Sequence, residues 1–269
     1  MKQIFIFAVA VMISGLFGCA SLESETATAQ TKNEKQTQPT KPPESKTKPT
    51  VLVELFTSEG CSSCPPADRV LSQLEKQPLN NEAEIITLAL HVDYWNYLGW
   101  KDEFSQKQFS ERQSGYAERF KLDSIYTPQM VVDGQVQFVG SNLDNANKAI
   151  NDAAKNQKAT IEISKAADKL KIRIAGAPAH DDAYVWLAIA EDDLKTNVRR
   201  GENGGKTLEH VSVAREMKLL GTLASTDKIF ESETALQLNS AWKKENLKFV
   251  VFVQGKGSKR VFGVSKLDN

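Results

Sequence analysis

The sequence has no excess of charge of either sign. Its 269 residues include 34 Lys and Arg and 34 Asp and Glu, which gives a formal net charge of zero. A general nucleic-acid binder needs surplus basic side chains to displace the counterions of the phosphates, so we expect no nucleic-acid partner. A hydrophobic fraction of 41% with 25% charged residues predicts that most of the chain folds around a core.

Cysteine is scarce, and the N-terminal apolar run is short. The chain has 3 cysteines, at positions 19, 61 and 64. Two of them, Cys61 and Cys64, form the single C-x-x-C, and three cysteines are too few for a four-cysteine zinc site. The apolar run from Ile4 to Leu16 is too short for a comfortable membrane span.

The start of the chain is typical of a targeting segment. Lys2 precedes the apolar run, and Gly18-Cys19 closes it in a pattern that resembles a bacterial lipobox. We therefore predict a lipoprotein signal peptide over residues 1–18, with Cys19 as the lipidated new N-terminus. No Asp follows Cys19, and in this the chain resembles Gram-negative lipoproteins that are sorted to the outer membrane. We therefore expect it on the periplasmic face of that membrane. The alternative is an ordinary secretory signal with an incidental cysteine.

Residues 19–49 have the composition of a tether. They are rich in Thr, Lys, Gln, Glu and Ser, contain four prolines and have no aromatic residue. Such a segment cannot bury enough apolar surface to offset its ordering entropy. We predict a disordered linker with a reach of about 30 Å, so that the protein meets the membrane only through its N-terminal lipid.

Residues 50–158 alternate between strand and helix patterns. Apolar runs predict strands, apolar residues at helical spacing predict helices, and Asp133-Gly134 marks a hairpin turn. The expected elements are a strand over 51–56, a helix opened by Pro65, a strand over 85–92, a helix around 109–120, a hairpin over 130–139 and a helix over 143–153.

The C-x-x-C of Cys61 and Cys64 is the strongest chemical signal. It stands between a strand with its short loop and a helix, where free amides and the helix dipole stabilise a thiolate at the first cysteine. The second cysteine lies one turn on and can resolve a mixed disulfide. A static disulfide is the alternative, but closing so short a loop gains little entropy.

Thr127-Pro128 is a second element of the site. A proline just before a strand, far along the chain from the C-x-x-C, predicts a cis peptide bond packed beside the disulfide. A trans proline at the start of an edge strand is the alternative.

These elements together resemble the thioredoxin fold. The segments from Glu54 to Asp68, from His91 to Asp102 and from Tyr126 to Gly134 more closely resemble a bacterial secreted family known as domain of unknown function 1223, in the thioredoxin-like superfamily. The resemblance covers most of the chain after Val51. It implies a fold and a redox site but no substrate.

The resemblance also implies roles for individual residues. Cys61 matches the attacking cysteine, Cys64 the resolving cysteine and Pro128 the cis-proline, with Thr127 facing the substrate. Glu54, in the strand before the motif, matches a buried acid that handles protons. The central pair Ser62-Ser63 differs from that of true thioredoxins, which leaves the direction of electron flow open.

The stretch from His91 to Trp100 is rich in aromatic residues and follows the second strand. We expect it at the same sheet edge as the C-x-x-C, where Trp95 would form a wall over the disulfide and His91 or Asp93 would move protons. The alternative is that the aromatics cover the core and that His91 and Asp93 fix a turn. His91 with Cys61 and Cys64 could also bind Cu(I), but we expect no resident metal or cofactor.

Residues 159–269 predict a β-rich, sandwich-like domain. Strand patterns recur from Thr160 to Val264 with turn residues between them. The polar loop from Arg199 to Lys206 is expected to be solvated, and His180 and His210 to be ordinary surface or strand residues.

The sequence therefore predicts an α/β thioredoxin-like domain followed by a β-sandwich-like domain, on an envelope lipoprotein. The predicted activity is thiol–disulfide exchange with protein thiols or disulfides and an unidentified redox partner. Two alternatives stay open. One is a non-catalytic binding or assembly lipoprotein with a structural disulfide, and the other is a copper-handling protein.

Overall fold

The computed structural model describes residues 48–76 and 83–269. The predicted signal peptide, the lipidation site Cys19 and almost all of the predicted linker lie outside these residues. None of the helices in the described ranges is long and apolar enough to cross a membrane.

The described chain alternates helices with strands in its first half and is almost entirely β in its second half. The elements are β1 Thr50–Thr57, α1 Pro65–Lys76, β2 Glu84–His91, α2 Lys107–Phe120, β3 Gln129–Val132, β4 Val136–Val139, α3 Leu143–Ala153, β5 Thr160–Ala166, β6 Lys169–Ala175, β7 Ala183–Glu191, β8 Leu194–Asn197, β9 Thr207–His210, β10 Val213–Leu223, β11 Ile229–Ala235, the 3-10 helix η1 Lys244–Asn246, β12 Leu247–Gly255 and β13 Val261–Asp268.

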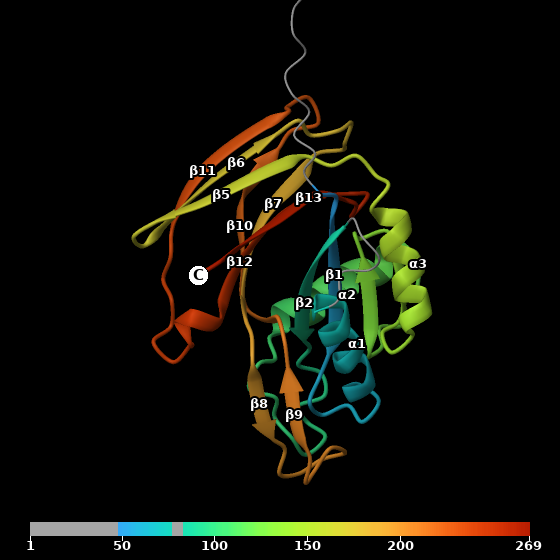
Figure 1. Ribbon diagram of the computed structural model, residues 1–269. Helices are drawn as coiled ribbons and strands as arrows, with labels where there is room; N and C mark the ends of the chain where they lie inside the picture. The colour runs from blue at the N-terminus through green and yellow to red at the C-terminus, as the bar shows by residue number, and fades with distance from the viewer. Residues whose placement is uncertain (1–47, 77–82) are drawn as a thin grey trace, which may run out of the picture. The chain divides into compact units, whose positions relative to one another are not determined.

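An 8-stranded mixed sheet runs through the whole fold, in the order β13-β12-β7-β10-β2-β1-β3-β4 (Figure 1). β1 and β2 pair in parallel, with Thr57 opposite His91 at their carboxyl ends. β10 pairs with β2 through Val213 and Ala89, and with β7 along nearly its whole length. The first and second halves of the chain thus meet in the middle of one sheet.

Both faces of this sheet are covered. α2 packs on one face, where Phe109 and Tyr116 join the core with side chains from β2, β7 and β12. α1 and α3 pack on the opposite face of β1, β2 and β3. Strands buried on both faces have nearly continuous apolar sequences, and this explains the apolar runs of β1 and β2, which only Glu54 and Thr87 interrupt.

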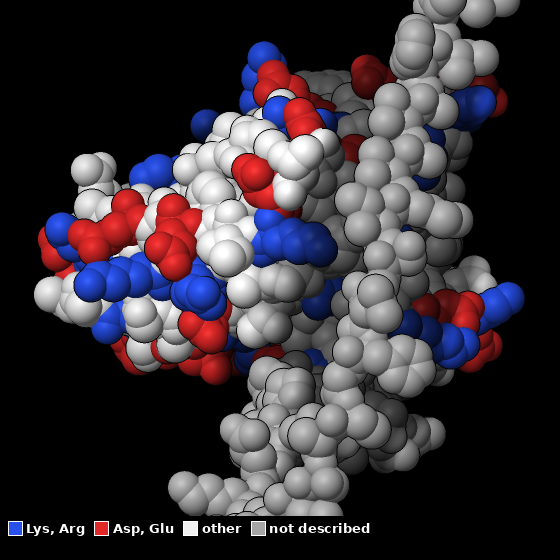
Figure 2. Space-filling model, turned by 90° about the horizontal axis from the view of Figure 1, so that it is seen from above, with Lys and Arg blue, Asp and Glu red and all other residues white. Residues whose placement is uncertain are grey.

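A second, 3-stranded sheet in the order β11-β6-β5 covers β7, β12 and β13 on the face opposite to α2. Its strands alternate apolar and polar residues, as expected for a sheet with one solvated face. Figure 2 views the molecule from above and shows acidic and basic side chains mixed over the visible face, without a large patch of one sign. Exposed pairs such as Lys169–Glu233 produce this mixture.

The fold is mixed α/β with a β-rich part, but the two parts share a sheet. The sequence predicted a separate sandwich after residue 158, whereas β7, β10, β12 and β13 extend the sheet of β1 and β2. Alternation along a strand shows which of its faces is covered but does not identify the neighbouring strand. Within this region β9 and β10 are separate strands, because the chain turns at Ser212, whose φ is 51°.

Candidate functional site

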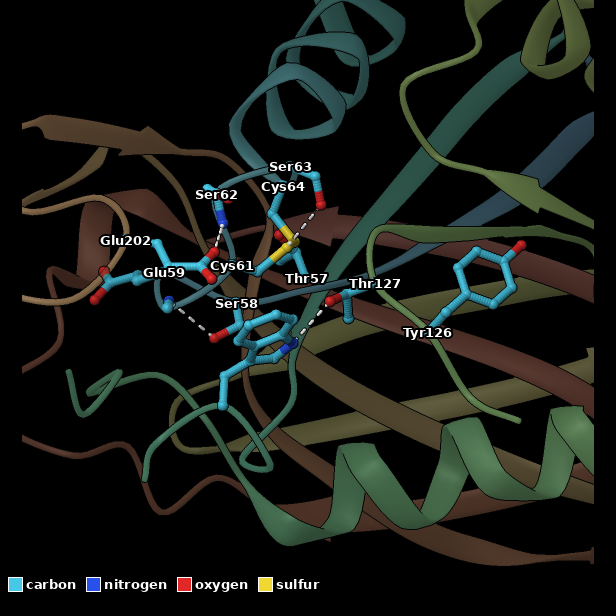
Figure 3. The surroundings of a disulfide bond; sticks show 12 residues. Thr57, Ser58, Glu59, Cys61, Ser62, Ser63, Cys64, Tyr126, Thr127 and Glu202 are labelled. Atoms are coloured by element: carbon cyan, nitrogen blue, oxygen red, sulfur yellow. Dashed lines mark hydrogen bonds between the residues drawn. A yellow bond between two sulfur atoms is a disulfide. The ribbon is translucent and has the colours of Figure 1, made fainter. Parts of the chain in front are cut away.

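The disulfide lies between the end of β1 and the start of α1. Cys61 and Cys64 are bonded, with Cα atoms 5.4 Å apart. Both cysteines are fully buried, whereas Ser62 and Ser63 between them are exposed (Figure 3). The pair is therefore closed, and its sulfur atoms are shielded from solvent in this state.

Few amides are available to Cys61. The Cys64 N–H donates to the carbonyl of Cys61 at 3.2 Å, and Pro65 and Pro66 have no N–H. The sequence predicted several free amides at this point, and the two prolines of the first helical turn remove two of them. The hydroxyl of Ser63 lies 3.3 Å from Cys61 Sγ. This hydroxyl can donate to a thiolate at Cys61.

The cis-proline loop and the aromatic segment meet beside the disulfide. The Thr127–Pro128 peptide bond is cis, as predicted. Trp95 Nε1 donates a hydrogen bond to Thr127 Oγ1 at 2.8 Å (Figure 3). Trp95 also packs on the disulfide loop so closely that a Cβ at Gly60 would lie 3.1 Å from Trp95 Cβ. The predicted substrate-facing residues Thr127 and Trp95 are thus joined to each other next to Cys61.

A buried group of carboxylates and imidazoles surrounds the same loop. His91 Nδ1 lies 2.7 Å from Asp102 Oδ2, which also accepts the Glu59 N–H at 2.9 Å. His210 Nε2 lies 3.3 Å from Glu59 Oε1. Thr57 Oγ1 donates to Asp68 at 2.8 Å, and Asp68 stands one helical turn after Cys64. We call Glu59, Asp68, His91, Asp102 and His210 the buried ionisable cluster, in which Asp68 is half-buried and the other four side chains are buried.

Two opposing effects determine the pKa values in this cluster: burial disfavours each charged form, and attraction between opposite charges favours it. Burial raises the pKa of Asp68, although His210 and His91 oppose this. Burial works against a charged His91, but the carboxylates of Asp102, Asp68 and Glu59 outweigh it, and the pKa of His91 is raised. Burial likewise opposes ionisation of Asp102, yet His91 and two backbone amides hold its pKa below the ordinary value. Both pKa shifts therefore favour the charged forms of His91 and Asp102.

Several polar atoms of the cluster lack hydrogen-bond partners among the described residues. These atoms are Glu59 Oε1, His91 Nε2 and both ring nitrogens of His210, because the 3.3 Å contact between His210 Nε2 and Glu59 Oε1 lacks hydrogen-bond geometry. Within residues 48–76 and 83–269, no three His, Cys, Asp or Glu side chains are arranged to hold a metal ion. The suggested copper ligands Cys61, Cys64 and His91 are therefore not arranged as a site in this state.

Glu54 does not lie with the cluster. Alternation along β1 puts it on the α2 face with Leu52 and Phe56, whereas Thr57 faces α1. There its carboxylate forms a two-point ion pair with Arg112, at 2.6 and 3.0 Å, and accepts a hydrogen bond from Tyr116. The structure thus shows Glu54 as one half of a buried ion pair with Arg112, and the proton-handling role that the resemblance implied stays a prediction.

Asp93 is also turned away from the disulfide. Its carboxylate accepts a hydrogen bond from the Ser110 hydroxyl of α2 at 2.5 Å. Among the nearby aromatics, Trp100 Nε1 donates to Glu59 Oε2 at 2.7 Å, whereas Tyr97 is 80% exposed. Asp93 therefore anchors the start of the aromatic segment to α2, and the segment itself divides into packed and exposed residues.

The sequence interpretation missed contributions from the β8–β9 hairpin. The loop expected to be solvated brings Asn203 against the disulfide loop, where its side chain donates to the carbonyls of Glu59 and Cys61, each at 2.9 Å. His210, expected to be ordinary, is buried with its ring centroid 5.0 Å from that of His91. No local sequence pattern marks either residue, because their partners lie more than 100 positions away.

The family of the chain follows from its sequence. The model of a family described as "Protein of unknown function (DUF1223)" matches residues 52–254. The chain belongs to this family. A comparison with curated proteins gives no match.

Two solved structures share the fold of this DUF1223 protein. Protein AGR_C_4864 from Agrobacterium tumefaciens is 24% identical, with a TM-score of 0.66 over 81% of this chain and 93% of its own. HBP35 of Porphyromonas gingivalis is 14% identical, with a TM-score of 0.57 over 82% of this chain and 75% of its own. Both matches extend over most of the chain, so they include the sheet that joins its two halves.

Proposed function

We propose that this protein is a lipid-anchored thiol–disulfide exchange protein of the bacterial cell envelope, with a thioredoxin-like site at Cys61 and Cys64. The observation that carries the proposal is a disulfide that spans only three positions, from Cys61 to Cys64, at the start of α1. A loop this short contributes little chain entropy, and this favours chemistry over stapling.

The exchange can be written with these residues. A thiolate of a protein dithiol attacks Cys61 Sγ, the Cys61–Cys64 bond breaks, and Cys64 leaves as a thiolate that takes up a proton. The second substrate thiolate then attacks the substrate sulfur of the mixed disulfide and releases Cys61. Two electrons pass to the protein, and the substrate becomes a disulfide. The reverse sequence reduces a substrate disulfide.

In this scheme Pro128 and Thr127 shape the edge on which an extended substrate segment lies, with Trp95 beside them. The buried ionisable cluster supplies proton-binding groups under the loop, through Asp68 one turn from Cys64. Glu54 has no part in the scheme, because its carboxylate is bound to Arg112 on the face of the central sheet that α2 covers.

A second candidate function is favoured by the burial of both cysteines. A fully buried pair is what a static disulfide in a binding or assembly lipoprotein requires. The two functions differ in reduction potential, since exchange catalysts lie at about −120 to −270 mV and structural disulfides below about −300 mV.

The test is a redox titration of the purified protein in mixtures of reduced and oxidised glutathione, followed by thiol alkylation and mass analysis of the 61–64 peptide. We expect a midpoint in the range of exchange catalysts. Cys64→Ser should leave Cys61 as a mixed disulfide with glutathione, whereas Ser63→Ala, a matched change inside the loop, should still close. A disulfide that no glutathione mixture reduces would support the structural role instead.

Anchoring is tested separately. Cys19→Ala should abolish incorporation of labelled palmitate and release the protein from the membrane fraction, because the lipid then has no attachment point. Ser21→Ala is the neighbouring control and should stay anchored. Palmitate incorporation by the Cys19 variant would refute the lipoprotein assignment.

A further inference from the structure

The tip of the β8–β9 hairpin is bound directly to the disulfide loop. Asn203 is fully buried and bridges the carbonyls on either side of Gly60, those of Glu59 and Cys61. Its own side-chain oxygen accepts a hydrogen bond from Lys206 at 2.9 Å. Asn203 therefore holds the hairpin tip in one position against the turn that contains Cys61.

This position brings a carboxylate to the amide that follows Cys61. Glu202 Oε2 accepts a hydrogen bond from the Ser62 N–H at 2.9 Å (Figure 3). The bond to Ser62 lowers the pKa of Glu202, so its carboxylate is charged at neutral pH. Glu202 itself is exposed.

The Ser62 N–H matters because donors are few at this helix start. Pro65 and Pro66 have none, and the Cys64 N–H is bonded to the Cys61 carbonyl. A thiolate at the first position of a C-x-x-C is stabilised by nearby amides and destabilised by nearby negative charge. Glu202 destabilises a Cys61 thiolate in both ways, because it occupies the Ser62 N–H and adds a negative charge.

We propose that Glu202 tunes the disulfide by raising the free energy of the Cys61 thiolate, so that the oxidised pair is favoured over the reduced pair. This inference rests on the proposed exchange function. Glu202 is a positioning residue that acts through the Ser62 amide and through its charge. It biases the site toward donating electrons to a substrate disulfide rather than accepting them from a dithiol.

Other charged groups also face the disulfide loop from the elements packed against it. The buried ionisable cluster lies on the side of β2 and β9, and Lys206 lies in the same hairpin tip as Glu202. The charged side chains concerned are those of Glu59, Asp68, His91, Asp102, Lys206 and His210. These six residues are the same in every variant that is compared. A difference in the pKa of Cys61 between the Glu202 variant and its control can therefore be assigned to the Glu202 carboxylate.

The experiment compares Glu202→Gln with Glu209→Gln. Glu209 is an exposed glutamate of the same hairpin, paired with Lys195 at 2.6 Å, so both variants lose one negative charge. The pKa of Cys61 is measured in a Cys64→Ser background, after phosphine reduction, from the pH dependence of iodoacetamide labelling of its peptide. The oxidised fraction of the parent protein is measured in glutathione mixtures.

We expect Glu202→Gln to lower the pKa of Cys61 by about half to one unit and to shift the glutathione equilibrium about three- to tenfold toward the reduced form. Glu209→Gln should change either quantity by less than about twofold. Glu202→Ala, which also frees the Ser62 N–H, should give the larger shift. Because Glu202 is exposed, both variants should fold, as a thermal melt of the oxidised protein will verify.

Equal pKa values for Cys61 in the two glutamine variants would overturn the inference and leave the exchange function standing. If the parent protein fails to exchange with glutathione, the proposed function fails, and the labelling of phosphine-reduced Cys61 still decides the effect of Glu202. A thiolate that becomes less stable in Glu202→Gln would show that the carboxylate has the opposite role.

Discussion

Replacing Glu54 with glutamine separates a structural role of this residue from the catalytic role that its position in β1 first implies. The carboxylate is 1% exposed, and its partner Arg112 is 10% exposed. Two hydrogen bonds join the two groups, at 2.6 and 3.0 Å. Tyr116 donates to the same carboxylate and in turn accepts from Gln254 of β12 at 2.8 Å.

The cost of the change follows from this geometry. Glu54→Gln would leave the guanidinium of Arg112 buried without a counter-charge, and removal of one partner of a buried pair costs about 3–5 kcal/mol. The exposed pair Lys195–Glu209, 65% and 71% exposed, gives the matched control, since solvent screens the attraction between exposed charges. Glu54→Gln should therefore lose at least about 2 kcal/mol more than Glu209→Gln.

The assay is equilibrium urea unfolding of the oxidised proteins, together with the pH profile of their exchange with glutathione. We expect a large drop in unfolding free energy for Glu54→Gln and an exchange profile with unchanged inflections. A variant that keeps its stability within about 1 kcal/mol but loses an inflection would refute the reasoning. Glu54 would then be the acid that serves the disulfide.

Three further outcomes test the structure. Asp102→Asn removes the carboxylate that contributes most to raising the pKa of His91, so NMR titration should show a lower pKa for His91 in the variant than in the parent protein. Stability contributed by His91 is present below about pH 6.5 and lost as pH rises through its raised pKa, and the variant should lose this dependence. Gly134→Ala should cost at least about 2 kcal/mol more than Gly176→Ala, since both have φ of 65° but only at Gly134 would a Cβ collide with a backbone oxygen, that of Lys259. Asn142→Ala should cost about 1 kcal/mol of unfolding free energy through the lost cap of α3.

Features encoded locally could be predicted from the sequence. The apolar runs of β1 and β2, the helix begun by Pro65 and the turn at Asp133-Gly134 each depend on residues close together in the chain, and the structure has them at those positions. The disulfide between Cys61 and Cys64 could be predicted for the same reason, since the two cysteines lie three positions apart in the chain. The cis bond before Pro128 was also predicted, from the order of the surrounding elements.

The arrangement of the second half of the chain could not be predicted in this way. The apolar residues of β7 and β12 showed that these strands are buried, but pairing with β10, and through it with β2, depends on backbone hydrogen bonds that any sequence can form. The expected sandwich therefore became the continuation of the central sheet.

The sequence by itself determined where the paired cysteines Cys61 and Cys64 stand and which local elements carry them, because periodicity, turn residues and a C-x-x-C act over a few positions. Only the tertiary structure decided what surrounds the sulfur atoms. Alternation along β1 sent Glu54 to the far face, and the β8–β9 hairpin brought Glu202, Asn203 and His210 to the disulfide loop. The electrostatics of a buried site depend on distances in space, which the order of residues along the chain does not give.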